Sequence, residues 1–131
     1  MCVFCEIVKG NIPSYKLYED DVCIAILDIS QATIGHTLVI PKKHIKNIFE
    51  LDSATASHLF KVVSNLAKKI KDALNVSNMN ILNNNGALAG QSVDHFHIHI
   101  IPRYEGDNLE IKFPSNKLSQ DEFNELLNKI K

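Results

Sequence analysis

The run His95-Phe96-His97-Ile98-His99-Ile100-Ile101 sets imidazoles and apolar side chains at alternate positions. Alternating side chains point to opposite faces of a β-strand. We therefore predict a strand over residues 96–101, stopped by Pro102, with the phenylalanine and isoleucines in the core. The three imidazoles would then share the other face of the sheet.

Three histidines on one straight strand are too far apart to hold a single metal ion. A two-residue step is about 6.6 Å, so the first and third rings would lie about 13 Å apart, whereas zinc–nitrogen bonds are about 2.0 Å long. Two neighbours, His95 and His97, could share a zinc ion. Otherwise the three rings have different tasks, unless the strand carries a polar face that is histidine by chance.

Length and charge narrow the class of protein. The 131 residues are 45% hydrophobic and fit a single domain over residues 1–131. With 14 Lys and Arg against 15 Asp and Glu, the net charge is −1, which lacks the basic footprint of a nucleic-acid binder. No apolar run approaches the about 20 residues that cross a bilayer, and no signal peptide is visible. We expect a cytoplasmic protein without nucleic-acid or membrane partners.

The remaining periodicity predicts an α+β fold, with a mainly antiparallel sheet, one long helix and a C-terminal helix. Strands are expected over residues 15–19, 22–28, 37–40 and 79–83, and a helical turn over 3–9. The strand at 22–28 is apolar on both faces and should lie inside the sheet. Asp52 or Ser53 should cap the long helix, which ends near residue 74, and Ser119 should cap the last helix, which ends near Ile130. Residues 105–118 should be irregular.

Four separated segments resemble the histidine triad (HIT) family, in its Hint-like branch of bacterial and protist type with a zinc-binding Cys-x2-Cys. The His-φ-His-φ-His-φ-φ run is the signature of that family. The other segments are 27–31, 35–45, and 83–86 followed by 90–92, and all four agree in order and spacing across about residues 2–104. The resemblance implies a HIT-like fold and a homodimer, and it leaves residues 105–131 as a variable C-terminal tail.

The resemblance also implies an enzyme that cleaves nucleotides at the α-phosphorus. In this family the central histidine, here His97, attacks phosphorus and forms a covalent nucleotidyl-histidine that water resolves. The substrate would be a purine, AMP-like nucleoside phosphoramidate, acyl-nucleotide or dinucleotide polyphosphate. Two other functions stay open: a zinc-dependent hydrolase that uses His95 and His97, and a non-catalytic nucleotide-binding module.

Phosphate contacts are expected from His99 and from the loop that precedes the triad. Gln91 and Ser92 would supply donors to the phosphoryl oxygens, and Gly90 would let the loop backbone approach closely. Ser92 or His99 could also pass a proton to the leaving group.

Nucleoside contacts are expected nearer the N-terminus. The resemblance assigns Asp28 to the ribose hydroxyls, with a turn aspartate as the alternative, and Asn84 to the ribose or phosphate, with a left-handed turn residue as the alternative. His36 is similar to a histidine that supports the triad, although a structural histidine is equally compatible with the sequence. Residues that could form the apolar slot for the base are Phe4, Ile7, Ile12, Ile26, Ile29 and Leu38.

Cys2 and Cys5 form a Cys-x2-Cys pair, which is half of a tetrahedral zinc site. By the resemblance, His44 and His95 complete it, and four protein ligands would make the zinc structural. A redox pair would require a βαβ context that the sequence lacks, so no redox cofactor is expected. Two ordinary thiols without a metal are the other alternative. Cys23 lies in a predicted strand and is expected to be a buried small residue.

Overall fold

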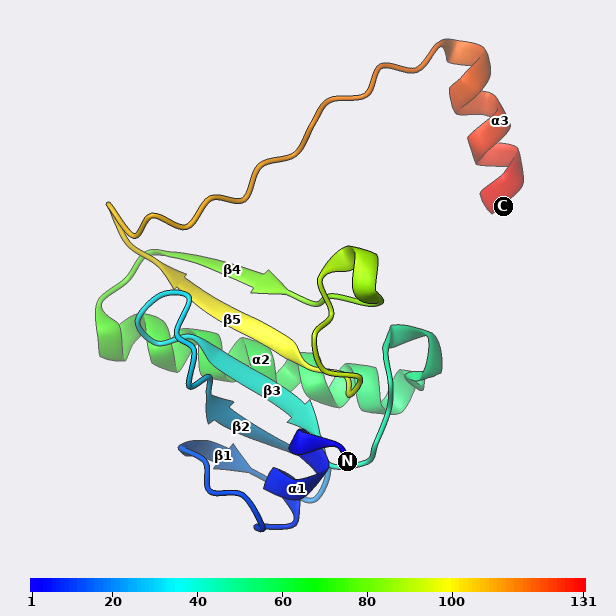
Figure 1. Cartoon of the computed structure of the whole chain (residues 1–131). Helices are drawn as coiled ribbons and strands as arrows, with labels where there is room; N and C mark the ends of the chain where they lie inside the picture. Colours follow the sequence, from blue (N-terminus) through cyan, green and yellow to red (C-terminus); the bar gives the residue numbers. More distant parts are fainter.

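Five antiparallel strands form one sheet in the order β1-β2-β3-β5-β4 (Figure 1). A computed structural model describes residues 1–131. The strands are β1 Lys16–Glu19, β2 Cys23–Leu27, β3 Thr37–Pro41, β4 Asn78–Leu82 and β5 Ile98–Arg103, and the α-helices are α1 Val3–Val8, α2 Ser53–Leu74 and α3 Gln120–Ile130. Short 3-10 helices cover Ile48–Glu50 and Ala87–Ala89. The predicted α+β architecture is confirmed.

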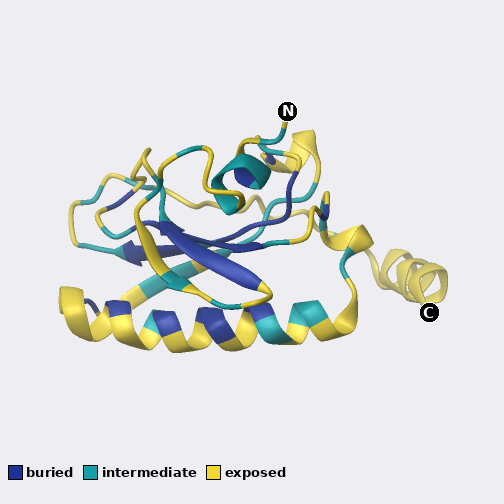
Figure 2. Cartoon of the chain, turned by 90° about the horizontal axis from the view of Figure 1, so that it is seen from below, coloured by how far each residue is buried: buried dark blue, intermediate teal, exposed yellow.

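Helix α2 covers one face of the sheet with an apolar stripe (Figure 2). The Asp52 side chain caps it by accepting a hydrogen bond from the Thr55 N–H, as predicted. The helix ends at Leu74, and the left-handed φ of 54° at the following residue, Asn75, turns the chain away. The buried side chains of α2 meet those of the strands in the larger core; from the helix they are Leu59, Val62, Val63, Leu66 and Ile70.

The opposite face of the sheet is covered by α1. Phe4 from this short helix packs on Ile24 and Ile26 of β2 and on neighbouring residues of β3. The alternate residues of β2, Cys23 and Ala25, belong to the core under α2. Strand β2 is therefore an interior strand that is apolar on both faces, as expected.

Strand β5 begins two residues later than expected, at Ile98. The backbone of the two preceding residues makes hydrogen bonds to groups that are not part of the β-sheet. The Phe96 N–H donates to the Ile45 carbonyl at 2.6 Å, and the Asn83 side-chain amide donates to the His97 carbonyl at 2.9 Å. The prediction of one straight strand that carries all three histidines is therefore wrong. The apolar residues at 96, 98 and 100 still enter the core as predicted.

The expected stop at Pro102 is also wrong, since β5 continues to Arg103. Strand β3 pairs with β5 only as far as Ile100, so at Pro102 only β4 lies alongside. A proline lacks the N–H that a second neighbour would need, and it is tolerated where that neighbour is absent. The Pro102 carbonyl accepts a hydrogen bond from the Thr33 hydroxyl at 2.6 Å.

Gly35 occupies a turn that only glycine fits well. Its φ is +98°, and a Cβ there would lie 2.5 Å from Leu74 Cδ1 and 3.1 Å from Pro102 Cγ. The end of the leucine side chain can turn away, but the proline ring is fixed. We expect Gly35→Ala to lower the free energy of unfolding by about 2 kcal/mol, measured by urea denaturation. Gly106→Ala is the control because its φ is +74° in open space. Equal losses in both variants would contradict the steric part of the argument.

The C-terminal segment leaves the body after β5 and ends in a helix that stands apart from it (Figure 1). The Arg103 guanidinium bonds Asp107 and the Leu109 carbonyl, and the segment makes no such anchor further on. Helix α3 begins with the predicted Ser119 cap, completed as a capping box by Glu122. No helix of the chain combines the length and apolar character needed to span a membrane.

Candidate functional site

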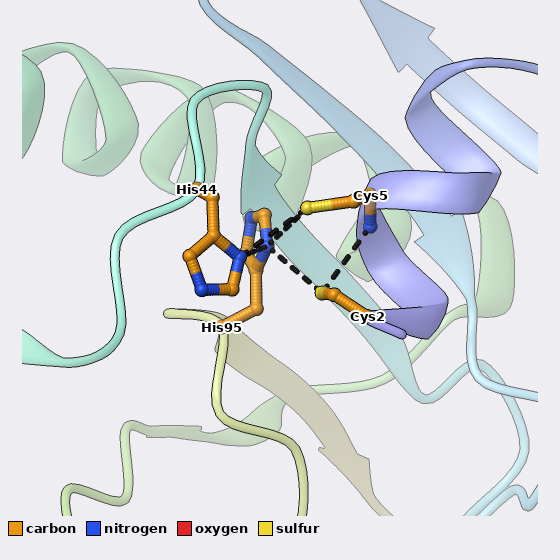
Figure 3. Close-up of side chains that lie close together, drawn as sticks. All are labelled: Cys2, Cys5, His44 and His95. Carbon is orange, nitrogen blue, oxygen red and sulfur yellow. Dashed lines mark hydrogen bonds between the residues drawn. The ribbon is translucent and has the colours of Figure 1, made fainter.

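Four side chains from three distant segments converge beside α1 (Figure 3). Cys2 caps the N-terminus of α1, Cys5 lies in the first turn of α1, His44 follows β3, and His95 precedes β5. Their ligand atoms lie within 4.8 Å of one another. The structure therefore brings together all four residues that the resemblance named as metal ligands.

The spacing of these atoms matches a tetrahedral zinc site. Bonds of about 2.3 Å to sulfur and 2.0–2.1 Å to nitrogen give edges of about 3.6 Å between sulfur and nitrogen and 3.3 Å between nitrogens. Here Cys2 Sγ lies 3.4 Å and Cys5 Sγ 3.6 Å from His95 Nδ1, and Cys5 Sγ lies 3.3 Å from His44 Nδ1. The two Nδ1 atoms are 3.2 Å apart. The donor set fits the ion in both chemistry and size.

A hydrogen bond to the backbone orients the His95 ring so that it can act as a metal ligand. Its Nε2–H donates to the Pro41 carbonyl at 2.8 Å, which leaves the lone pair of the neutral ring on Nδ1, toward the two sulfurs. Burial lowers the pKa of His95, and this favours the neutral, ligating form. Burial and the adjacent Cys2 raise the pKa of the Cys5 thiol, an effect that a bound cation would oppose.

His97 has one ring nitrogen fixed and the other free. Its Nδ1–H donates to the His95 carbonyl at 2.8 Å, so the lone pair lies on Nε2. Nε2 has no partner in the chain, and no fully buried side-chain nitrogen lacks one, so this atom reaches solvent although the residue is only 6% exposed. The Phe4 ring meets the imidazole edge-on, with centroids 5.1 Å apart. His97 is thus held as an oriented base or nucleophile.

His99 lies beside His97 and is held by His36. The ring centroids of the two triad histidines are 4.9 Å apart, and His99 Nδ1 lies 2.8 Å from His36 Nε2. His36 Nδ1 accepts a hydrogen bond from the Ala32 N–H at 3.1 Å, so the proton of its neutral ring is on Nε2 and donates to His99. The proton of His99 is then on its own Nε2, which has no partner in the chain. Asp28 Oδ2 completes this cluster, 3.7 Å from His36 Nε2.

Burial keeps both supporting rings neutral near pH 7. It lowers the pKa of His99 to about 4, helped by the neighbouring His97 and His36, and it lowers the pKa of His36. The site therefore offers a free lone pair on His97 next to a free N–H donor on His99. Such a pair can attack an electrophilic centre while stabilising negative charge that develops on it.

The lowered pKa values make the stability of the fold sensitive to acid. The histidine pKa is about 6.5 in an unfolded chain and about 4 for His99 in the folded protein. Between these pH values the unfolded chain is protonated at this residue and the folded protein is not. Stability is complete above pH 6.5 and falls as the pH drops toward 4, by about 2 kcal/mol at pH 5 from His99 alone. We expect His99→Gln to lose this share of the difference in unfolding free energy between pH 7.5 and 5.0. An unchanged difference would contradict the argument.

The loop before the triad contains the other predicted phosphate contacts. The side-chain amide of Gln91 is already engaged: Nε2 donates to the Lys46 and Val93 carbonyls, and Oε1 accepts from the Gly86 N–H. It shapes the loop and has no amide hydrogen left for a phosphate, which differs from the expected donor role. Ser92 is exposed without a side-chain hydrogen bond, and it lines a cavity of about 580 Å³ together with Cys2 and His44.

Gly90 has a left-handed φ of 91°, and a Cβ there would lie 3.4 Å from Asn84 Nδ2, so these two predicted residues are neighbours. Asn84 itself has no positive φ, which removes the left-handed turn as an explanation for it. The sequence did not single out Asn83 and Asn85, the residues on either side of Asn84. Asn83 holds the His97 carbonyl, and Asn85 donates to the Asn83 side chain at 2.5 Å. The only signal in the sequence was the asparagine run itself.

The residues predicted to form an apolar slot for the base do not all lie together. Phe4, Ile26 and Leu38 share one buried cluster, with Ile7 packed against it. Ile29 stands apart on the surface, with 87% of its side chain exposed next to Asp28. Ile12 is outside the buried cluster. The exposed isoleucine is thus the predicted slot residue that is most available to a ligand.

Comparison with known proteins places this chain in a family. Residues 9–106 match the family model described as HIT domain. The protein hit of Bacillus subtilis is 54% identical over 81% of this chain and 74% of its own length. Adenosine 5′-monophosphoramidase hnt1 of Schizosaccharomyces pombe is 42% identical over 95% of this chain and 92% of its own. Adenylylsulfatase HINT3 of Arabidopsis thaliana is 44% identical over 82% and 55%.

Solved structures agree with this placement. A HIT family protein from Bacillus anthracis is 45% identical and superposes with a TM-score of 0.93 over 98% of this chain and 94% of its own. A zinc-bound histidine triad family protein from Mycobacterium smegmatis is 36% identical, with a TM-score of 0.79 over 98% and 91%. This chain belongs to the HIT family.

Proposed function

We propose that the protein is a nucleotide hydrolase that cleaves a purine nucleoside phosphoramidate, acyl-nucleotide or dinucleotide polyphosphate at the α-phosphorus. His97 Nε2 attacks phosphorus, the leaving group departs with a proton, and water resolves the nucleotidyl-histidine to a nucleoside monophosphate. The observation that carries this proposal is the fixed tautomer of His97, whose lone pair reaches solvent beside the His99 donor. The phosphoramidase and adenylylsulfatase relatives support the substrate class.

Roles for the surrounding residues follow from the same geometry. His99 Nε2–H donates to a phosphoryl oxygen in the transition state, and the backbone at Gly90 and Ser92 approaches the phosphate. Gln91 shapes that loop. Asp28 with Ile29 borders the ribose and base, and Asn84 contacts the ribose or phosphate. The Asp28 side chain also lies next to His36, which is the hydrogen-bond partner of His99.

We further propose a structural zinc ion held by Cys2, Cys5, His44 and His95. When bound, it supplies a cross-link between α1 and the segment that precedes β5. The alternative of a hydrolytic zinc shared by His95 and His97 is disfavoured by orientation. His95 directs Nδ1 to the cysteines, and His97 uses its own Nδ1 as a donor and belongs to no group of possible ligands.

A homodimer in the cytoplasm completes the proposal. The free edge at β4 supports the dimer, because β4 is regular and carries no charged residue or proline to block pairing with another strand. At the other edge, β1 contains Lys16 and Glu19 and a shift in register. The three free thiols suit a reducing compartment.

The test is incubation of the purified protein with adenosine 5′-phosphoramidate. We expect release of AMP and, on rapid acid quench, an adenylyl adduct on intact-protein mass spectra, mapped to the peptide with residues 95–101. Binding of AMP without turnover of any of the three substrate classes would favour the non-catalytic module. Turnover that a chelator abolishes, with no adduct detected, would favour the zinc-dependent hydrolase.

A further inference from the structure

One glutamine in the loop between β2 and β3 uses all of its side-chain hydrogen bonds on backbone groups. Gln31 Nε2 donates to the Asp28 carbonyl at 2.5 Å and to the His36 carbonyl at 2.8 Å. Gln31 Oε1 accepts from the Gly35 N–H at 2.8 Å and from the His36 N–H at 3.1 Å. A primary amide has two N–H donors and two acceptor lone pairs, so none is left for another partner.

These bonds join the two ends of the loop. The Asp28 N–H also donates to the His36 carbonyl at 3.0 Å, so residues 28 and 36 face each other where the chain leaves β2 and enters β3. The Gln31 amide links the carbonyls of both residues and adds the N–H of His36. Without the amide, the Asp28 N–H would make the only remaining backbone hydrogen bond between the two ends.

Both ends carry groups of the proposed site. Asp28 is the proposed ribose contact, and the His36 ring donates to His99 Nδ1 at 2.8 Å. Ala32, which follows Gln31, donates its backbone N–H to His36 Nδ1 at 3.1 Å. Gln31 therefore fixes the backbone of His36, while the next residue along the loop fixes the tautomer of its ring.

The hydrogen bonds of this loop require a glutamine. Gln31 is exposed, and fixing a long exposed side chain costs rotamer entropy, which its four hydrogen bonds offset. A glutamate of the same length would keep the acceptor oxygen and lose both donations. A methionine of similar length would lose all four hydrogen bonds. The amide itself, rather than the length or polarity of the side chain, holds the two ends together.

We propose that Gln31 is a positioning residue for the reaction: it fixes Asp28 and His36 relative to each other, and through His36 it keeps the His99 N–H directed at the phosphoryl group. This inference rests on the proposed function and adds a residue to it. One side chain then influences nucleotide affinity through Asp28 and the rate of transfer through His36. A side chain with only a structural role would change stability and neither of these quantities.

The tautomers of the rings provide a test that does not depend on turnover. Zinc-loaded, full-length protein is labelled with 15N-histidine, and long-range 1H–15N spectra near neutral pH show which nitrogen of each ring carries the proton. We expect the proton on Nε2 of both His36 and His99 in the wild type, and mixed tautomers at both rings in Gln31→Met. Gln31→Glu is the second variant and should show the same mixture. Wild-type tautomers in both variants would overturn the proposal.

Kinetics and binding measure the two routes separately. We expect Gln31→Met to lower kcat for adenosine 5′-phosphoramidate about tenfold and to raise the Kd of AMP at least about threefold. In the His36→Ala background, the same change should leave kcat within about twofold and still raise the Kd, because only the route through His36 has been removed. A further loss of about tenfold in kcat in that background would overturn the route through His36.

Asp52→Ala is the matched control for stability. It removes another side-chain hydrogen bond to the backbone, the cap of α2, so it should destabilise the fold and leave kcat, the Kd of AMP and the tautomers unchanged. Equal losses of kcat in Asp52→Ala and Gln31→Met would show that Gln31 acts through stability alone and would overturn the proposal. Absence of turnover in the wild type would instead overturn the proposed function, and the tautomers and AMP affinity would still decide whether Gln31 positions His36 and Asp28.

Discussion

Replacing His97 with alanine is expected to reduce kcat for adenosine 5′-phosphoramidate by at least about 10³-fold and to abolish the adenylyl adduct. The reason is that Nε2 of this ring is the free lone pair held toward solvent with its tautomer fixed. The proposed transfer makes that atom the site of the new bond to phosphorus. Single-turnover kinetics with acid quench measures the rate and the adduct together.

The control for this variant is His58→Gln. His58 lies on α2 and contacts Asp20 at 2.6 Å, away from the triad, so its replacement should leave turnover within about twofold. AMP affinity should also survive in His97→Ala because the proposed ribose contacts, Asp28 and Asn84, do not use this ring. Wild-type turnover in His97→Ala would remove His97 from its assigned role, and an adduct that persists there would place the nucleophile elsewhere.

Replacing Cys5 with serine is expected to remove zinc and to lower the melting temperature by about 10 °C. A structural zinc site contributes its binding free energy to folding, and a loss of about 3 kcal/mol in a chain of this length corresponds to such a shift. Zinc content by elemental analysis and melting by circular dichroism are measured on the same samples. One zinc per chain is expected in the wild type and less than about 0.1 in the variant.

Cys23→Ala is the matched control for the metal. Cys23 is fully buried on the other face of the sheet and is not one of the four proposed zinc ligands, so its replacement should lower stability and keep the zinc. A wild-type protein that is purified without chelator and contains no metal would contradict the zinc site. Zinc retained at full occupancy in Cys5→Ser would contradict the ligand set.

Sequence patterns predicted the elements because those patterns report local physics. The cap at Asp52, the stripe of α2 and the cap at Ser119 depend on neighbours within a few residues, and all three agree with the structure. The start of β5 depends instead on Asn83 and Ile45, whose contacts with residues 96 and 97 join distant segments. Alternation alone could not reveal that these groups take the backbone out of the ladder.

The same limit applies to the candidate site. The resemblance named the four metal-ligand candidates, and the structure brings their ligand atoms together. The engagement of the Gln91 amide by three backbone groups was not predictable, because it depends on how one loop folds on another. The position of helix α3 away from the rest of the chain also has no local signature, because the apolar residues of α3 predict burial without indicating the surface on which they pack.

Phe4 lies between Cys2 and Cys5 in the first turn of α1, and its ring contacts the His97 ring. Under the proposed zinc assignment, supply of the metal to the cell also governs the packing of the reactive imidazole. Molecules made during zinc starvation would keep every reacting group but lose the metal cross-link that fixes the position of Phe4. Turnover per molecule would then fall with the zinc content of the growth medium.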